Sequence, residues 1–356
     1  MEIKLGCIAG DGIGPELVEQ IKKVVKHVCE IYGHHVLFVD IEAGSASVQQ
    51  NKDPFTKEAY QQCKECHGLI LGNMWMHLNP ELEKDKRPSA LLGKIRKAFN
   101  LSLNIRPNYL FESVFDLSPL KPEILKEGFD ILLIRDLAGG ELTGKRYRDQ
   151  NMAYDVDSYT RKQIGNLADF GFKASLIRSK NLMSLDKAVV LESSRFFREI
   201  VNQRHEQYKD VILKHQHIDD AASQIIRDPQ SYDVIITNGM FGDILADEIA
   251  AMTGIQKMLP SAELNEVGFG LYTPNNLHNT DLNFGKDEAN PIGLIMASAL
   301  FFRYSLGLEQ EAQCIEKAVQ AVLDKKFALN DFCGKDRIRI SQSMFVSKIM
   351  DEMRGN

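Results

Sequence analysis

Strand-like and helix-like segments alternate along this chain, and that order limits its possible folds more than any other feature. Residues 3–10 (IKLGCIAG) have the composition of a buried strand. A glycine-rich turn at 11–16 leads into apolar residues that recur at helical spacing over 17–31. Because strands that alternate with helices form parallel sheets, we predict an α/β fold.

The alternation continues through the middle and the last third of the chain. Further strands are predicted at 35–41, 68–72, 129–136, 210–218 and 232–238. Further helices are predicted at 57–63, 158–172, 187–204, 219–228 and 292–307, with a polar segment at 137–155 and a loop-rich segment at 268–291. The 356 residues exceed what one core usually supports, so we expect two domains, although no linker marks a boundary.

Charge and hydropathy exclude several partners. The net charge of −6 argues against a nucleic-acid surface, which shows itself as a basic excess. No apolar run approaches the roughly 20 residues of a membrane span. The start (MEIKLGCIAGDGIG) enters strand-like sequence without a basic segment before it. We therefore expect a cytoplasmic protein that binds neither nucleic acid nor membrane.

The glycines of the first turn do not make a dinucleotide-binding fingerprint. Gly10 and Gly12 fit G-x-G-x-x-G, but Pro15 occupies the position of its last glycine. A tight turn into a helix and a loop that lines a ligand both remain open.

Three arginines are candidates for binding an anionic ligand: Arg96, Arg106 and Arg135. Arg135 ends an apolar strand, and ligand sites of α/β proteins form at the carboxyl ends of strands. Guanidinium groups bind carboxylates or phosphates through paired hydrogen bonds. For each arginine taken alone, the sequence favours a structural ion pair over ligand binding, and Arg135 has a possible partner in its neighbour Asp136.

Carboxylates and one lysine form a second group of candidates. Asp243 and Asp247 are one helical turn apart, so they face the same way, and a divalent cation would relieve their repulsion. Asp219 follows a predicted strand and is a third possible ligand, although it would also suit a helix cap. Lys187 begins a predicted helix, where it either accepts a proton or extends to solvent.

Several motifs together resemble the β-decarboxylating dehydrogenases, the family of isocitrate and 3-isopropylmalate dehydrogenases. They extend over nearly the whole chain in family order: GDGIGPE, IRKAFNLSLNIRP, SPLKPE, IRDLAGG, DKAVVLESSRFFRE, DDAASQIIRDP, FGDILADE, GFGLY and ANP. The segments SPLKPE and VLESSRFFRE place the chain nearer the isopropylmalate branch.

The resemblance implies a role for each candidate. Asp219, Asp243 and Asp247 would hold Mg²⁺ or Mn²⁺ against the substrate. Arg96, Arg106 and Arg135 would bind the carboxylates of a di- or tricarboxylate substrate. Lys187 would assist removal of the hydroxyl proton, reaching into the active site from a partner subunit. A homodimer with shared active sites is therefore expected.

The resemblance also implies a fold and a cofactor. We expect two α/β domains with a shared sheet: residues 1–101 with 254–356 on the cofactor side, and 102–253 for substrate, metal and dimerisation. NAD is expected as cofactor because Asp281 matches an aspartate that bonds the adenosine ribose. The other residues expected to bind the cofactor are Leu282, Asn290, Asn276 and His278.

The chain departs from the family pattern around the reacting atoms. Glu141 occupies an aliphatic position, and Leu142 replaces the tyrosine that protonates the enolate. Leucine has no proton to give, so Glu141, Tyr147 or water would have to act instead. Other departures are Val189 and Asp220 for asparagines, Asn276 for a histidine that His278 can replace, one extra residue in the loop around them, and the segment around Trp75.

These departures lead to an expectation about the substrate. We expect an NAD-dependent oxidoreductase that acts on the CH–OH group of a 3-substituted malate, with decarboxylation, as a specialised paralogue of 3-isopropylmalate dehydrogenase. The alternatives are 3-isopropylmalate dehydrogenase itself and a regulatory subunit without turnover.

Overall fold

Two compact units make up the chain. The computed structural model describes residues 1–74, 81–126, 128–278 and 285–355. One unit combines Met1–Asn100 with Ile255–Asn356, and the other is Leu101–Gly254. Both units are α/β, which confirms the predicted fold class.

The first unit is built on five strands in the order β2-β1-β3-β12-β11. Neighbours in this order are parallel, except that β11 and β12 are antiparallel. The strands are β1 (Glu2–Gly10), β2 (His35–Asp40), β3 (Gly68–Asn73), β11 (Pro260–Leu264) and β12 (Gly270–Pro274). All residues of β3, β11 and β12 are buried, as expected for strands covered on both faces.

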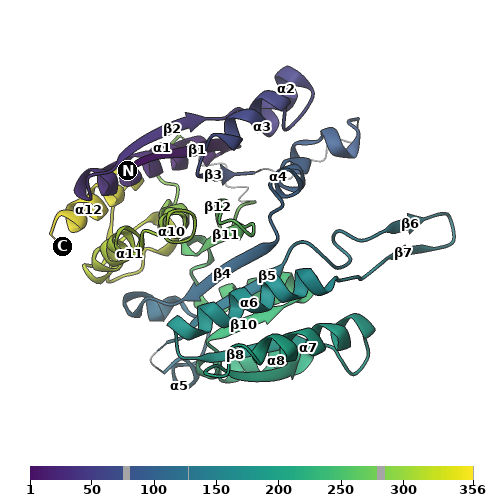
Figure 1. Cartoon of the computed structure of the whole chain (residues 1–356). Helices are drawn as coiled ribbons and strands as arrows, with labels where there is room; N and C mark the ends of the chain where they lie inside the picture. Colours follow the sequence, from purple (N-terminus) through teal and green to yellow (C-terminus); the bar gives the residue numbers. More distant parts are fainter. Residues whose placement is uncertain (75–80, 127, 279–284, 356) are drawn as a thin grey trace. The chain divides into compact units, whose positions relative to one another are not determined.

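Helices and short segments complete this unit (Figure 1). The helix α1 contacts β1, β2 and β3, and α10 contacts β11 and β12. The α-helices are α1 (Gly14–Ile31), α2 (Ser45–Asn51), α3 (Lys57–Lys64), α4 (Leu91–Phe99), α10 (Ile292–Leu300), α11 (Glu309–Asp324) and α12 (Gln342–Arg354). The other elements are 3₁₀ turns at Lys84–Lys86, Pro88–Ala90, Gln256–Met258 and Asn330–Phe332, a π-helical turn at Phe301–Ser305, and the short pair β13 (Phe327–Ala328) and β14 (Ile338–Arg339).

The second unit has five strands in the order β4-β5-β10-β8-β9. All neighbours are parallel except β4 and β5. The strands are β4 (Leu103–Tyr109), β5 (Asp130–Asp136), β8 (Asn181–Asp186), β9 (Ile212–His217) and β10 (Val234–Thr237). A separate hairpin, β6 (Arg146–Arg148) with β7 (Ala153–Asp155), extends from this unit as an arm (Figure 1).

Helices cover both faces of this second set of strands. They are α5 (Pro122–Leu125), α6 (Arg161–Ile177), α7 (Glu192–His205), α8 (Ile218–Arg227) and α9 (Gly239–Thr253), with 3₁₀ turns at Glu112–Leu117 and Pro229–Ser231. A Cβ added to Gly171 of α6 would meet Ile236, and one added to Gly242 of α9 would meet Thr237. Because neighbouring strand residues point to opposite faces, α6 and α9 lie on opposite sides of β10.

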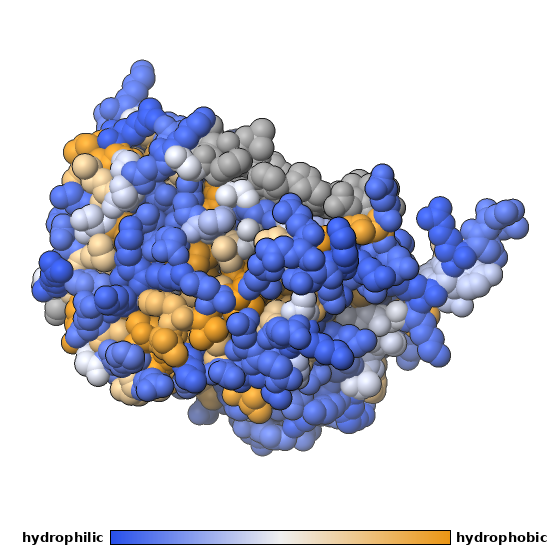
Figure 2. All heavy atoms as spheres, turned by 90° about the horizontal axis from the view of Figure 1, so that it is seen from above, coloured by the Kyte–Doolittle hydropathy of each residue, from blue (hydrophilic) through white to orange (hydrophobic). Residues whose placement is uncertain are grey.

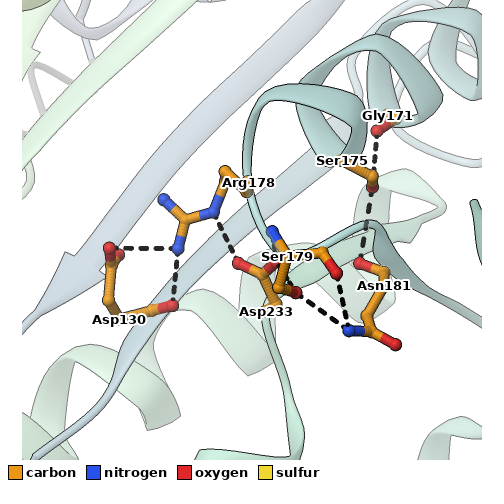
Figure 3. Close-up of polar contacts among 7 residues, drawn as sticks. All are labelled: Asp130, Gly171, Ser175, Arg178, Ser179, Asn181 and Asp233. Carbon is orange, nitrogen blue, oxygen red and sulfur yellow. Dashed lines mark hydrogen bonds and ion pairs between the residues drawn. The ribbon is translucent and has the colours of Figure 1, made fainter.

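An arginine joins the end of α6 to two strands of the second unit (Figure 3). The Arg178 guanidinium donates from Nη2 to the Asp130 carbonyl at 2.7 Å and forms an ion pair with the Asp233 carboxylate. The Ser179 backbone N–H donates to the same Asp233 side chain at 3.0 Å. These contacts satisfy polar groups at the carboxyl end of α6 and fix it beside the starts of β5 and β10.

Some predicted elements differ from the structure. Lys187 does not begin a helix: it follows β8, and α7 starts only at Glu192. The polar segment 137–155 contains the β6–β7 hairpin, and the loop-rich segment 268–291 contains β12. The sequence does not predict β6, β7 or β12, because polar or glycine residues interrupt the apolar alternation that marks a strand.

Hydrophilic side chains cover most of the face drawn in Figure 2. Among the residues that the structure describes, no helix combines the length and the apolar composition that crossing a membrane requires.

Candidate active site

Gly242 of α9 allows Asp243, a predicted metal ligand, to contact Arg135, a predicted substrate-binding residue. The helix begins after Asn238, whose side chain accepts from the Phe241 backbone N–H at 3.0 Å. A Cβ added to Gly242 would lie 2.5 Å from the Arg135 Cβ, so only glycine permits this approach. The next residue, Asp243, consequently forms an ion pair with the Arg135 guanidinium.

One asparagine orients two of the three predicted substrate arginines. The Asn104 Oδ1 accepts hydrogen bonds from the Nε atoms of both Arg106 and Arg135, each at 3.0 Å. Asn104 is buried on β4 and lies opposite Arg135 of β5 in the antiparallel register. The two guanidinium groups therefore meet at the Asn104 oxygen, and Arg135 also contacts Asp243. Asn104 was missed in the sequence, although its position two residues before Arg106 places both on one face of a strand.

The exposed side of α9 combines the two acidic residues with apolar ones. Asp243 and Asp247 are both exposed and one turn apart. Met240 and Ile244 lie on the same side, and Ile244 keeps 66% of its surface exposed.

The predicted lysine and the third predicted metal ligand form a separate pair. Lys187 Nζ forms an ion pair with the Asp219 carboxylate, which lies in the first turn of α8, and this contact lowers the pKa of Asp219. The buried Asp186 accepts two hydrogen bonds from Arg198 at 2.8 Å and one from the Ala188 N–H at 2.9 Å. These bonds fix the end of β8, from which Lys187 extends.

Two of the three predicted metal ligands lie together on α9. Asp243 and Asp247 supply the oxygen ligands that Mg²⁺ and Mn²⁺ prefer. Within the described part of the chain, no group of three His, Cys, Asp or Glu side chains comes close enough to hold an ion. Asp219 is paired with Lys187 and does not complete such a group.

The third predicted arginine lies in the other unit. Arg96 of α4 donates to both oxygens of Glu263 in β11, at 2.8 Å from Nε and 2.6 Å from Nη2. Glu263 is buried, so this is the structural ion pair that the sequence left open as an alternative. A role for Arg96 in substrate binding stays a prediction.

The loop after β5 carries the two departures from the family pattern. The Leu142 side chain points toward the start of α9, where it would lie 3.3 Å from a Cβ on Gly239. The Glu141 carboxyl turns toward Asp157, and each residue has one buried carboxyl oxygen without a partner in the described structure. Burial and the neighbouring Asp157 raise the pKa of Glu141, so it holds its proton more tightly than an exposed glutamate.

A tyrosine missed in the sequence lies between this loop and α9. The Tyr159 hydroxyl accepts from the Gly239 N–H at 3.3 Å, and burial raises the pKa of its phenol. A Cβ on Gly139 or Gly140 would clash with its ring or hydroxyl, which explains the paired glycines of the loop. No sequence signal marks Tyr159, because it sits in a polar stretch before α6.

A buried aspartate beside the site should make the stability of the fold depend on pH. Burial raises the pKa of Asp136 to about 6, although the Ala138 and Gly139 N–H groups donate to it. Since the folded chain then binds this proton more tightly than the unfolded chain, its contribution to stability falls as pH rises from about 4 to 6. A shift of about two pKa units corresponds to roughly 3 kcal/mol.

The substitution Asp136→Asn should remove this dependence. We expect it to raise the free energy of unfolding at pH 7.5, relative to wild type, by about 1 to 3 kcal/mol and to change it little at pH 4. Urea denaturation of both proteins at the two pH values measures the difference. An equal change at both pH values would contradict the assignment.

The backbone geometry at the end of β1 requires a glycine at position 10. A Cβ on Gly10, whose φ is +74°, would lie 1.8 Å from the Asn73 carbonyl oxygen. The Asp11 N–H donates to that same oxygen at 2.9 Å. The close approach of β1 to the end of β3 therefore accounts for Gly10 without a ligand.

The residues predicted to bind the cofactor are only partly described. Asp281 and Leu282 lie outside the described residues. His278 is exposed, and its Nδ1 lies 3.4 Å from the Met74 carbonyl oxygen, while Asn276 is half-buried beside it. The Asn290 amide donates to Asp331 at 3.1 Å and accepts from the Ile292 N–H.

Comparison with known proteins decides the family. Residues 4–352 match the family described as isocitrate/isopropylmalate dehydrogenase. The chain belongs to this family. It is therefore an oxidoreductase that acts on a CH–OH group, as the sequence predicted, and the family uses NAD and a divalent metal.

Two relatives match the chain along nearly its whole length. A 3-isopropylmalate dehydrogenase of Buchnera aphidicola subsp. Cinara cedri is 39% identical and is aligned over 99% of this chain and 98% of its own length. A 3-isopropylmalate dehydrogenase of Oleidesulfovibrio alaskensis is 38% identical and is aligned over 93% of this chain and 94% of its own length. These relatives agree with the resemblance to the isopropylmalate branch.

Solved structures share the fold of this family member. An isocitrate dehydrogenase of Methylococcus capsulatus superposes with a TM-score of 0.85 at 23% identity and covers 99% of each chain. A β-decarboxylating dehydrogenase of Thermococcus kodakarensis superposes with a TM-score of 0.81 at 26% identity. The superposition covers 99% of this chain and 96% of that protein's chain. The first of these supports the fold alone.

Proposed function

We propose that this dehydrogenase uses NAD⁺ and Mg²⁺ or Mn²⁺ to oxidise, and then decarboxylate, a 3-substituted malate. The observation that carries the proposal is the meeting of Arg106 and Arg135 on Asn104, directly beside Asp243. Two oriented guanidinium groups suit the carboxylates of a malate, and the adjacent aspartate suits a cation bound to its α-carboxylate and hydroxyl.

Each protein group has a distinct role in this reaction. Arg106 and Arg135 hold the carboxylates and so fix the geometry of the reacting carbon. Lys187 would take the proton of the C2 hydroxyl, and NAD⁺, when bound, would supply the hydride acceptor. A divalent ion at Asp243 and Asp247 would polarise the oxygen at C2 and stabilise negative charge there as CO₂ departs. An acid then returns a proton to C3, and we assign this role to Glu141.

We infer that two copies of the chain form a homodimer with shared active sites. The Lys187–Asp219 pair and the α9 carboxylates form two separate groups in the described chain, so each supplies part of a site. Exposed apolar side chains of the Leu101–Gly254 unit offer a surface for such an association. They include Tyr147, Met152, Tyr154, Val189, Val190, Met240 and Ile244.

We further infer which unit serves which ligand. The unit with both chain ends contains Asn276, His278 and Asn290 and is assigned to the cofactor. The Leu101–Gly254 unit contains Arg106, Arg135 and the aspartates and is assigned to substrate, metal and dimerisation.

The substituent at C3 is proposed to be polar or of unusual shape. Leu142, Glu141 and Val189 change the loop after β5 and the segment after Lys187 together, and Val189 is 63% exposed. Such changes at several ligand-facing positions favour a specialised paralogue over neutral drift. A second candidate substrate is 3-isopropylmalate, favoured by the names of the relatives at 39% and 38% identity.

The first experiment is NADH formation by the purified protein with Mn²⁺, while CO₂ release is followed in parallel. The panel contains malate, 3-isopropylmalate, isocitrate, homoisocitrate, tartrate and malates with polar C3 substituents. The proposal expects the highest kcat/KM on a polar 3-substituted malate, with CO₂ released.

Two outcomes contradict parts of the proposal. A preference for 3-isopropylmalate, together with full complementation of a leucine auxotroph that lacks its own isopropylmalate dehydrogenase, would establish the second candidate. NADH formation without CO₂ would show that decarboxylation does not survive the replacement of the family tyrosine by Leu142.

A further inference from the structure

Two carboxyl groups of the second unit face each other with no donor between them. Glu141 Oε1 and Asp157 Oδ1 are both buried, and neither has a hydrogen-bond partner among the described residues. A Cβ added to Gly140, the residue before Glu141, would lie 3.6 Å from the same Asp157 oxygen. Two negative charges at such short range repel, so the pair is stable only with a proton or a cation between its oxygens.

Asp157 is held in this place through its other oxygen. The Ser193 hydroxyl, in the first turn of α7, donates to Asp157 Oδ2 and leaves Oδ1 toward Glu141. The helix α7 directly follows the segment that begins with Lys187. One side chain therefore connects the loop of the proposed acid to the segment of the proposed base.

The charges around this loop favour a proton over a cation between the two carboxyls. The Arg146 guanidinium forms its ion pair with Asp155 at 3.4 Å and donates to the backbone carbonyl of Glu141, also at 3.4 Å. Burial and the charge of Asp157, followed by that of Asp155, raise the pKa of Glu141. The titratable or charged groups that face the loop, among the described residues, are Asp136, Arg146, Asp155, Asp157 and Tyr159. The single basic group in this set is already paired, so a shared proton is what relieves the repulsion.

We propose that Asp157 is a positioning residue that keeps Glu141 protonated for the return of a proton to C3. The inference rests on the proposed acid role of Glu141, and it explains how a carboxyl, which is ionised at neutral pH in ordinary surroundings, fills that role. The proton leaves a Glu141 oxygen as the C3–H bond forms, and the two carboxylates that remain then take a proton from solvent. Asp157 itself contacts neither substrate nor metal in this step.

The test measures the protonation of Glu141 apart from activity. The full chain is labelled with ¹³C at the side-chain carboxyl carbons of glutamate, and an NMR titration follows the resonance that is absent in Glu141→Gln. Asp157→Asn keeps the shape of the side chain and can still accept from Ser193, but it removes the charge. Asp157→Ser is a second variant without the charge, and Ser193→Ala is the matched control that keeps the charge and removes its support.

The proposal expects the charge of Asp157, and not its support, to set the protonation of Glu141. In both uncharged variants the Glu141 carboxyl titrates at a lower pH than in wild type, whereas in Ser193→Ala it stays protonated over the wild-type range. Keto-acid formation from the panel malates, with Mn²⁺ at pH 7.5, falls about tenfold in the uncharged variants, and the loss becomes smaller as pH falls. Melting temperatures of all variants show whether the fold is kept.

Other outcomes overturn the inference. A Glu141 carboxyl that titrates at the same pH in wild type and in both uncharged variants would refute the shared proton. A wild-type Glu141 that titrates below the ordinary range, and rises when K⁺ or Mn²⁺ is removed, would place a cation between the carboxyls instead. A lowered titration with unchanged keto-acid formation would refute the acid role of Glu141, and with it the role of Asp157 in that step, while the carboxyl pair itself would stand.

Discussion

An equimolar mixture of two inactive variants, Lys187→Met and Asp243→Asn, is expected to recover about a quarter of the wild-type activity once the subunits exchange. Half of the dimers are then heterodimers, and one of their two sites combines an intact Lys187 from one chain with an intact Asp243 from the other. Each variant alone should lose activity on the order of 10³-fold, since proton transfer or metal binding is removed. NADH formation before and after exchange measures the recovery.

The matched control is a mixture of Lys187→Met with Asp219→Asn. These residues form one ion pair within a chain, so they are expected to enter the same shared site together. No heterodimer site then contains both intact, and no recovery is expected. If the first mixture stays inactive although exchange of labelled subunits is observed, the active site lies within one chain and the shared-site proposal is wrong.

The substitution Glu141→Gln is expected to lower keto-acid and CO₂ formation on the order of 10²-fold while NADH and Mn²⁺ binding stay unchanged. Glutamine keeps the size of the side chain and can donate to Asp157, so the loop after β5 should keep its conformation. It has no acidic proton to return to C3. The raised pKa of Glu141 means that the wild-type protein should lose this step as pH rises through that pKa.

The substitution Tyr147→Phe tests whether Tyr147, rather than Glu141, is the acid that protonates C3. The Tyr147 hydroxyl donates to Asp149 at 2.8 Å on the exposed β6–β7 hairpin, so its proton already has an acceptor. A loss of CO₂ formation in Tyr147→Phe, with Glu141→Gln fully active, would transfer the acid role to the hairpin. Product release by both variants at the wild-type rate would leave water as the proton source.

Spacing along single elements predicted several local features of the candidate site. Asp243 and Asp247 share one exposed side of a helix, because i, i+4 spacing has that consequence in any helix. Arg135 ends a buried strand, as its apolar run indicated. These features need only local periodicity, which a single sequence contains.

Contacts between distant segments were not predictable in the same way. Asn104 meets Arg135 only because β4 and β5 pair in one antiparallel register, and no residue near either strand specifies that register. The apolar residues after Lys187 predict a helix that includes it, but β8 ends at Asp186, which Arg198 of α7 binds, and α7 begins only at Glu192. The buried side-chain amide of Asn275 has no hydrogen-bond partner in the described structure, and this property of the packing leaves no trace in the sequence.

The single amide oxygen of Asn104 has a consequence for how this enzyme family can diversify. Because β4 and β5 set the spacing of Arg106 and Arg135, the proposed binding of the malate portion of a substrate would not depend on the loops around it. The loop after β5, which holds Glu141 and Leu142, could then exchange residues without loss of that binding. Under this proposal, a lineage that inherits this pair of strands could acquire a new acid as substrate by altering only the residues around its side chain.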